Sequence, residues 1–363
     1  MLSPLDDFPF HQTSEPIAVV GTSDRNFYDR YYFNLYSIER DLFVTAGLGQ
    51  YPNLGVTDGF VSATTATSQH VVRASRELGL DRSDTTVGPL SVEIYEGLKR
   101  LRLRLDENDG GVSLDVTWTP SIPAFLEARH VNRRGVRITT ETSRFAQTGF
   151  WSGTLRVGGE QFDVEPSTWW GGRDRSWGIR PVGEAEPNPR REGERPGGFL
   201  WLYCTMQFAE STIICILQED SIGRRSLEQA MRVWADPTRE PVDLGRVEHD
   251  ITFVSGTRRI ESMALCFRDG TGSETVVDAR PFGASYLSLG TGYGMDDEWR
   301  NGQYQGRLAV QHRDFDLTDP AVIKQSYGLV DNVATYRLDG EVGYGLLENA
   351  VLGPNVHYGL GMR

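Results

Sequence analysis

The sequence predicts an all-β protein of mainly antiparallel strands, folded into barrels or half-barrels with few short helices. Three observations lead to this fold class. Several segments alternate apolar and polar residues with a period of two, which is typical of strands with one buried face. The 40 glycines are spread along the 363 residues, as many short turns require. Helical patterns are few and short.

Two predicted hairpins show the alternation most clearly. Leucine alternates with arginine over residues 101–105, residues 108–111 read Asn-Asp-Gly-Gly, and the alternation resumes over residues 112–118. A second pair of segments, residues 154–157 and 160–164, flanks a Gly-Gly turn. Glycine reaches the positive φ angles that tight hairpin turns need. We therefore expect both segments to form antiparallel strand pairs.

Further strands and two short helices complete the predicted elements. The other strand candidates are residues 136–142, 199–208, 211–218, 246–254, 259–267 and 303–311. The helical candidates are residues 123–131 and a turn that opens at Asp319-Pro320. Long antiparallel sheets with so little helix favour barrels or sandwiches.

The length of the chain predicts two domains. A chain of 363 residues is too long for one compact core. Residues 183–198 combine prolines, glycines and charges without apolar periodicity, which is typical of a linker. We therefore expect an N-terminal domain over residues 1–185 and a C-terminal domain over residues 186–363.

Composition narrows the classes of function. The net charge of −13 disfavours nucleic acid and anionic membranes as partners, because both bind basic patches. Three scattered cysteines argue against a disulfide framework, and the N-terminus has no secretory pattern, so a cytoplasmic location is expected. No apolar run approaches a membrane span. No two histidines have metal-binding spacing and no cofactor motif occurs in its required context, so no metal and no cofactor are expected. The sequence predicts no oligomeric state.

The most distinctive segment is residues 169–180, which read Trp-Trp-Gly-Gly-Arg-Asp-Arg-Ser-Trp-Gly-Ile-Arg. It resembles the Arg-Asp-His-x-Trp-Gly motif of the carotenoid 1,2-hydratase (hydroxyneurosporene synthase) and AttH-like family. The aromatic residues 27–34 and the Phe-Trp-Ser-Gly of residues 150–153 resemble two further strands of that family. The resemblance implies two lipocalin-like (calycin-type) β domains. It also implies a protein that hydrates, cyclises or binds apolar isoprenoids and other natural products.

The sequence departs from the family pattern at two places. Arg175 stands where the hydratases of the family carry histidine. Tyr203 matches their tyrosine, but Thr205 stands where they carry the acid. The hydratase activity therefore does not carry over residue by residue.

The chemistry nevertheless points to candidate residues. Protonation of a double bond needs a carboxylic acid that apolar surroundings keep neutral, and aromatic faces stabilise the resulting cation. Asp174 and Glu348 are the predicted acids, Glu348 because it lies in the final predicted strand. The predicted ligand-binding residues are Trp169, Trp170, Arg173, Arg175, Trp177, Arg180, Trp201 and Tyr203.

An alternative stays open for the motif. Arg173 and Arg175 flank Asp174 and would keep its carboxylate ionised, so Asp174 could instead form an ion pair with Arg180 or another arginine at the domain junction. In an extended segment Arg173 and Arg175 point to one side and Asp174 to the other. Only one of these sets can line a cavity.

Two functions remain. The first is a cofactor-independent enzyme of the hydratase, cyclase or isomerase type. It acts by acid–base chemistry on an isoprenoid, steroid or polyketide-like molecule in a β-barrel cavity. The alternative is a non-catalytic lipocalin-like carrier of such a hydrophobic ligand. They differ in whether a carboxylic acid of the pocket stays neutral near neutral pH.

Overall fold

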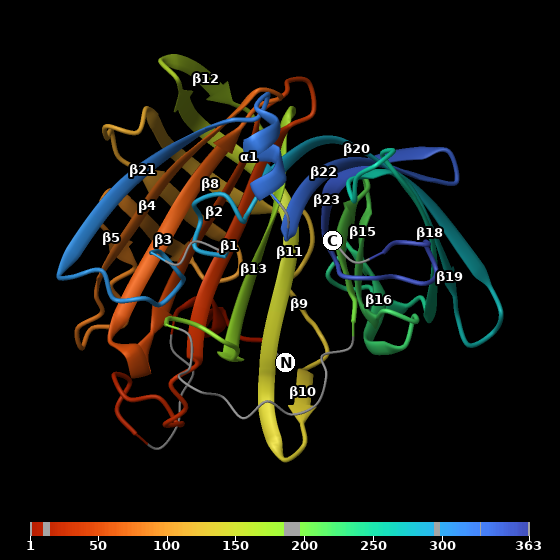
Figure 1. Cartoon of the computed structure of the whole chain (residues 1–363), viewed down its shortest axis with the longest axis horizontal. Coiled ribbons are helices and arrows are strands. Elements are labelled where there is room, and N and C mark those ends of the chain that lie inside the picture. Colours follow the sequence, from red (N-terminus) through yellow and green to blue (C-terminus); the bar gives the residue numbers. More distant parts are fainter. Residues whose placement is uncertain (1, 10–14, 185–196, 294–297, 327, 362–363) are drawn as a thin grey trace.

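The computed structural model describes residues 2–9, 15–184, 197–293, 298–326 and 328–361. Two antiparallel sheets lie side by side, a large one that is curled into a nearly closed barrel and a smaller half-barrel (Figure 1). This architecture confirms the all-β, mainly antiparallel prediction. In the described ranges, no helix combines the length and the apolar character needed to cross a membrane.

The first sheet has 14 strands, with the order β21-β4-β3-β2-β1-β13-β11-β8-β7-β6-β5, and the short strands β9, β10 and β12 pair with β11. Its strands are β1 (Phe27–Ser37), β2 (Phe43–Tyr51), β3 (Val56–Thr64), β4 (Ser68–Glu77), β5 (Thr86–Val87), β6 (Leu90–Glu96), β7 (Arg100–Leu105), β8 (Val112–Pro120), β9 (Phe125–Leu126), β10 (His130–Arg134), β11 (Arg137–Val157), β12 (Glu160–Val164), β13 (Trp169–Ile179) and β21 (Leu308–Asp316). Contacts of β5 with β3 and β4 bring the two ends of the sheet together.

The second sheet has nine strands, with the order β17-β16-β15-β14-β23-β22-β20-β19-β18. They are β14 (Phe199–Gln207), β15 (Ser211–Asp220), β16 (Arg225–Trp234), β17 (Val242–Asp243), β18 (Arg246–Phe253), β19 (Ile260–Arg268), β20 (Glu274–Tyr286), β22 (Leu329–Leu338) and β23 (Glu341–Leu352). The helical turns are η1 (Pro4–Asp7), η2 (Pro52–Leu54) and α1 (Pro320–Gln325).

The predicted hairpins are confirmed, and one helix is not. β7 pairs with β8, and β11 pairs with β12 through Val157 and Glu160. Asp319 caps α1 by accepting a hydrogen bond from the Ala321 amide, as its Asp-Pro turn predicts. The helix predicted over residues 123–131 is wrong, because β9 and β10 occupy this segment and pair with β11. Backbone pairing with the 21-residue β11 outweighs a weak local helix preference.

Each sheet encloses its own apolar core. One cluster fills the first barrel and includes Trp118 and Trp151, both fully buried. A second cluster fills the half-barrel around Ile213 and Leu265. Bulky side chains therefore occupy both barrel interiors. The expected ligand cavity inside a barrel gives way to a different location, described below.

A third apolar cluster joins the two sheets. Tyr36 and Ala146 of the first sheet pack with Ile214, Val333 and Leu346 of the second. Hydroxyl contacts reinforce the junction at its edges, with 2.6 Å between Thr148 Oγ1 and Thr212 Oγ1 and 3.2 Å between Thr45 Oγ1 and Ser285 Oγ. The first sheet thus buries both of its faces, one in the barrel and one against its neighbour.

The predicted boundary between residues 185 and 186 lies outside the described residues. The two sheets separate near that place in the sequence, except that β21 from the second half of the chain pairs with β4 of the first sheet. The division of the chain at residue 185 therefore stays a prediction.

Candidate functional site

The motif strand β13 sends its two central arginines into the first barrel. Arg173 Nη1 lies 2.5 Å from Asp7 Oδ1, and Arg175 forms an ion pair with Asp29. All four side chains are fully buried. The prediction that Arg173 and Arg175 bind the ligand therefore gives way to a structural role, because protein carboxylates already pair with both charges on the face opposite Asp174.

The tryptophans of the motif divide between the same two faces. Trp169 is 2% exposed and belongs to the core of the first barrel. Trp170 packs at the junction between the sheets, with its ring edge-on to Tyr344 of β23 at 5.4 Å between centroids. Trp177 is half-buried. Of the three, Trp170 is the one that reaches the second sheet.

Asp174 lies on the face of β13 that is turned toward the second sheet, beside Tyr32 of β1 in the strand register. Asp174 is half-buried and, like Tyr32, which donates its hydroxyl to Asp331, faces the space between the two sheets. No described residue donates a hydrogen bond to it. Burial raises the pKa of Asp174 to about 7, and the carboxylates of Glu127 and Glu348 oppose its ionisation further, while Arg144 and Arg180 lower it. Arg173 and Arg175, its neighbours in sequence, lie on the opposite face of β13, so burial is the largest influence on its pKa.

Two further carboxyl groups lie on adjacent strands of the second sheet. Asp331 of β22 and Glu348 of β23 are direct partners in the strand register. Tyr32 donates its hydroxyl to Asp331 Oδ2 across the junction, and Trp201 Nε1 donates to Glu348 Oε1 at 2.5 Å. Burial raises the pKa of Asp331 well above its ordinary value, and burial also raises that of Glu348. The interaction with Glu348 raises the pKa of Asp331, whereas the interaction with Asp331 lowers that of Glu348, so a proton shared by the pair belongs on Asp331.

An ion pair with a tyrosine completes the acidic side of the site. Arg144 of β11 donates from Nε to Glu127 Oε2 at 2.7 Å, and Tyr203 of β14 donates its hydroxyl to Glu127 Oε1 at 2.9 Å. The Arg144 guanidinium lies over the Tyr203 ring, 4.2 Å from its centroid. Glu127 is 3% exposed and Arg144 16% exposed, so the pair is enclosed. Burial raises the pKa of Tyr203 well above its ordinary value.

Arg180, directly after β13, forms the opposite wall with two tyrosines. Its guanidinium lies 4.4 Å from the ring centroid of Tyr28 and 5.7 Å from that of Tyr293. Its charge lowers the pKa of both Asp174 and Glu348, so it lies within electrostatic reach of these acids. It is enclosed and partly accessible, as they are.

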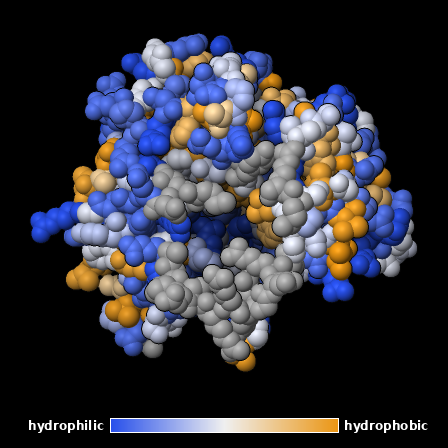
Figure 2. Space-filling view, viewed as in Figure 1, coloured by the Kyte–Doolittle hydropathy of each residue, from blue (hydrophilic) through white to orange (hydrophobic). Residues whose placement is uncertain are grey.

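These groups form one assembly, which we call the inter-sheet polar cluster. It consists of Tyr32, Glu127, Arg144, Asp174, Arg180, Trp201, Tyr203, Tyr293, Asp331 and Glu348. The molecular face in Figure 2 is hollowed between the two sheets, and hydrophilic atoms lie at the bottom of this hollow. The cluster therefore combines acids, two cations and aromatic rings between the sheets, which is a typical arrangement for a small-molecule site.

Part of this cluster is predicted from the sequence, and the structure brings these predicted residues together: Asp174, Glu348, Arg180, Trp201 and Tyr203. Three further members are not predicted from the sequence: Glu127, Arg144 and Asp331. Arg144 and Asp331 are charged residues within strand segments. Such a residue is a weak indication of a functional site. Glu127 carried no signal, because its segment was interpreted as a helix.

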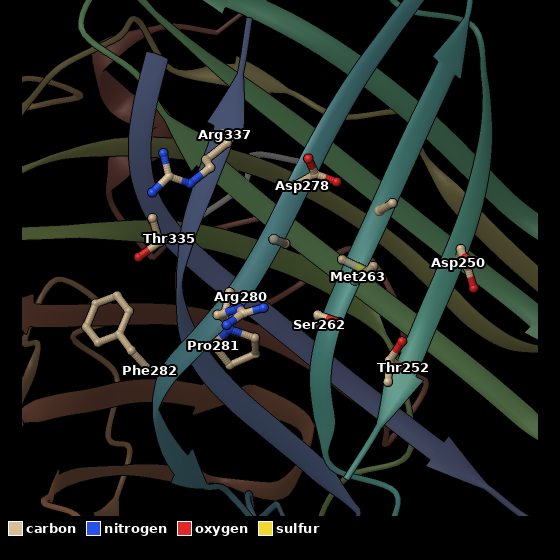
Figure 3. Close-up of a pocket in the computed structure, with 12 residues that line it drawn as sticks. Asp250, Thr252, Ser262, Met263, Asp278, Arg280, Pro281, Phe282, Thr335 and Arg337 are labelled. Carbon is tan, nitrogen blue, oxygen red and sulfur yellow. The ribbon is translucent and has the colours of Figure 1, made fainter. Parts of the chain in front are cut away.

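A separate groove lies on the outer surface of the second sheet (Figure 3). Its volume is about 650 Å³, and Asp250, Asp278, Arg280, Phe282 and Arg337 contribute to its lining from β18, β20 and β22. All five are exposed to solvent, so water competes for every polar contact there. We place the candidate site at the inter-sheet polar cluster instead, where ionisable groups are enclosed.

The described residues contain no group of three or more His, Cys, Asp or Glu side chains arranged to hold a metal ion. Residues 290–293 of the glycine-rich stretch follow β20 as a loop, and residue 294 lies outside the described residues.

A sequence model of the Family of unknown function (DUF8625) matches residues 2–361. The chain belongs to this family. No curated protein matches the DUF8625 chain in sequence.

Solved structures resemble the DUF8625 chain in fold. A protein of Nitrosomonas europaea described as an AttH (NE1406) superimposes with a TM-score of 0.55 at 13% identity, over 89% of this chain and 92% of that chain. CghA with Sch210972 gives a TM-score of 0.52 at 12% identity, over 91% of this chain and 89% of that chain. At such identities the likeness shows the fold alone. The resemblance to AttH-like, lipocalin-type proteins is confirmed at that level.

Proposed function

We propose that this protein is a cofactor-independent enzyme that performs acid–base chemistry on a hydrophobic small molecule in the space between its two sheets. Asp174 is the proposed general acid, and the Glu348–Asp331 pair is the proposed second proton site. The observation that carries the proposal is an enclosed carboxyl group, Asp174, which faces an internal space without a described hydrogen-bond donor and has a pKa raised to about 7.

The pKa of Asp174 suits proton transfer. A group that is about half protonated near neutral pH can donate a proton and accept one back in the same catalytic cycle. In a hydration, Asp174 would give its proton to one carbon of a double bond while water attacks the other carbon. The proton that the water loses would then return to the carboxylate, so no net proton is consumed. An isomerisation would use the same group at two different carbons.

The surrounding residues support this assignment. The ion pair between Glu127 and Arg144 is closed within the protein and also accepts the Tyr203 hydroxyl, so these groups hold a fixed electrostatic field beside Asp174. Trp170 and Trp201 supply aromatic surface near the acids. Binding energy for the apolar part of the substrate would come from these faces.

The alternative is a carrier with the same cavity. A carrier gains nothing from several enclosed carboxyl groups, since each one with a raised pKa weakens folding when it ionises. CghA, which shares this fold, has been crystallised with Sch210972, and this supports a bound small molecule under either function. The enclosed acids favour the enzyme.

Deuterium exchange distinguishes the two functions. Purified protein is incubated in heavy water with a panel of terpenoids, steroids and polyketide-like enones, and the recovered compounds are analysed by mass spectrometry. We expect deuterium incorporation or addition of water in at least one compound, and a loss of about 100-fold or more in rate in the Asp174→Asn variant with binding retained.

The matched control is Asp163→Asn, an exposed aspartate on β12, which should exchange at the wild-type rate. Compounds that bind the wild type without any exchange would support the carrier. Exchange that persists unchanged in Asp174→Asn would remove Asp174 from the chemistry.

A further inference from the structure

Within the part of the chain that the structure describes, no carboxylate forms an ion pair with Arg180, which lies at the wall of the inter-sheet polar cluster. No described residue accepts a hydrogen bond from its guanidinium, which lies over the rings of Tyr28 and Tyr293. The other arginine of the cluster differs, because Glu127 pairs with Arg144. An enclosed guanidinium without a carboxylate leaves several N–H donors to be satisfied.

A second unpaired guanidinium lies behind Tyr293. Arg30 of β1 is 2% exposed, and none of its three side-chain nitrogens has a hydrogen-bond partner among the described residues. It lies 4.6 Å from the centroid of Tyr293, and Gly47 and Gly49 leave room for it, because a Cβ at either position would come within 3.0 Å of Arg30. The carboxylate of the nearby Asp58 is already engaged by the Tyr51 hydroxyl and the Gly302 amide.

The side of the cavity that carries Arg180 is therefore electropositive. The ring of Tyr293 lies between the guanidinium groups of Arg30 and Arg180 and is in contact with both. The nearest acids across the cavity are Asp174 and Glu348, whose enclosure favours their neutral forms. Asp58 interacts electrostatically with both guanidinium groups, so among the described residues one carboxyl group faces two cations on this wall and the excess charge is positive.

This charge distribution discriminates between substrate classes. A carbocation, formed by protonating an isolated double bond, would be repelled by Arg180 across a low-dielectric space. An oxygen that gains negative charge, as in an enolate or a polarised carbonyl, would be stabilised there. Asp174 and Glu348 can donate a proton in either reaction. The charge of Arg180 is therefore the feature that favours one substrate class over the other.

We propose that Arg180, with the Tyr293 hydroxyl, binds a carbonyl, enolate or carboxylate oxygen of the substrate, and that the substrate is an apolar carbonyl compound rather than an isoprenoid hydrocarbon. The inference rests on the proposed function, since it names the substrate class of the same cavity. Asp174 would then protonate a carbon of the conjugated system while Arg180 holds the charge on oxygen.

Two probes that share the same hydrocarbon chain test whether Arg180 anchors a substrate oxygen. Farnesoic acid and farnesol differ only in a carboxylate against a hydroxyl, and their binding to the full chain is measured by calorimetry at about pH 6, where the proton of Asp174 is mostly retained. We expect the wild type to prefer the acid by about tenfold or more. Arg180→Gln should abolish this preference and leave the affinity for farnesol unchanged within about twofold.

Two control variants distinguish the possible outcomes. Arg156→Gln changes an exposed arginine of β11 and should keep the preference, and Arg180→Lys, which keeps the charge, should retain part of it. Equal affinities in the wild type, or a preference that survives in Arg180→Gln, would overturn the anchor while the proposed cavity stands. If the wild type binds neither probe, the Arg180 anchor and the proposed function both fail.

Discussion

Successive residues of β13 have opposite electrostatic surroundings. Arg173 and Arg175 are neutralised in the first barrel by Asp7 and Asp29, whereas Asp174 faces the internal space without a described partner. The period-two geometry of a strand is sufficient to produce both outcomes. A buried ion pair and an acid with a raised pKa thus lie on the two faces of one strand.

The alternation within the motif could be predicted from its sequence, but the occupants of its two faces could not. The counter-ions of the arginines come from residues 7 and 29, which are about 145 to 165 positions away along the chain. Sequence proximity suggested instead that the arginines act on Asp174. The pKa of that acid depends on enclosure by the second sheet, which no local pattern encodes.

The raised pKa of Asp174 predicts a pH-dependent stability. The folded protein holds this proton more tightly than the unfolded chain, so the stabilisation is complete below about pH 4 and is lost as the pH rises through about 7. Relative to Asp174→Asn, the wild type should lose roughly 2–4 kcal/mol of unfolding free energy over this range and then level off. Urea unfolding at several pH values measures the difference. A difference that does not vary with pH would show an ordinary surface carboxylate.

The buried ion pair at Arg175 predicts a different variant behaviour. Arg175→Met removes one of the two arginines that pair with Asp29, since Arg82 Nη2 remains 3.2 Å from Asp29 Oδ2, and it should lower the unfolding free energy by about 1.5–3 kcal/mol. Binding of an apolar ligand, measured on the folded fraction, should not change. If Arg175→Met kept the wild-type stability but lost ligand binding, Arg175 would be a ligand-binding residue, as the sequence predicts.

At the scale of elements, the segment that contains β9 and β10 supports the site. It pairs with β11, brings Glu127 to Arg144, and is tied to the second sheet by a 2.9 Å hydrogen bond from the Ala128 amide to Gln229 Oε1. Its sequence suggests a helix because of one proline and a few helix formers. The long edge of β11 decides its conformation, and that edge is not visible from residues 123–131 alone.

Glu127→Gln tests how this segment sets the acidity of Asp174. The substitution removes a negative charge that raises the pKa of Asp174 and leaves Arg144, which lowers it, without its counter-ion. The pKa of Asp174 should therefore fall by roughly one or more. Carbon-13 NMR of labelled aspartate side chains gives the value, and Glu107→Gln at an exposed loop position serves as the control. An unchanged or higher pKa would contradict the assigned electrostatics.

At the scale of the whole molecule, neither sheet contains the site by itself. The first sheet contributes Asp174, Arg144 and Tyr32, and the second contributes Asp331 and Glu348. Alternating strands and glycine turns were sufficient to predict both sheets. The way they pack face to face was not predictable, because the joining cluster combines side chains from strands far apart in the sequence. This is why the candidate site is placed between the sheets rather than inside a barrel.

Two neighbouring isoleucines of β15 test the role of the junction. Ile214 packs between the sheets and Ile213 packs inside the half-barrel. Truncation of either to alanine should lower the unfolding free energy by about 2–5 kcal/mol. Ile214→Ala should also lower the pKa of Asp174, since a looser junction admits water, whereas Ile213→Ala should not. If Asp174 had the same pKa in Ile214→Ala and Ile213→Ala, packing at the junction would not determine its acidity.

The direct test of the proposed site is the pKa of Asp174 in the folded wild type. Carbon-13 NMR of labelled aspartate, with the signal assigned by its absence in Asp174→Asn, follows the carboxyl group between about pH 3 and about pH 9. We expect its midpoint near 7, well above that of exposed aspartates such as Asp163. A midpoint at or below about 4 would show an ionised, solvated carboxylate at neutral pH. That result would contradict an acid–base site between the two sheets.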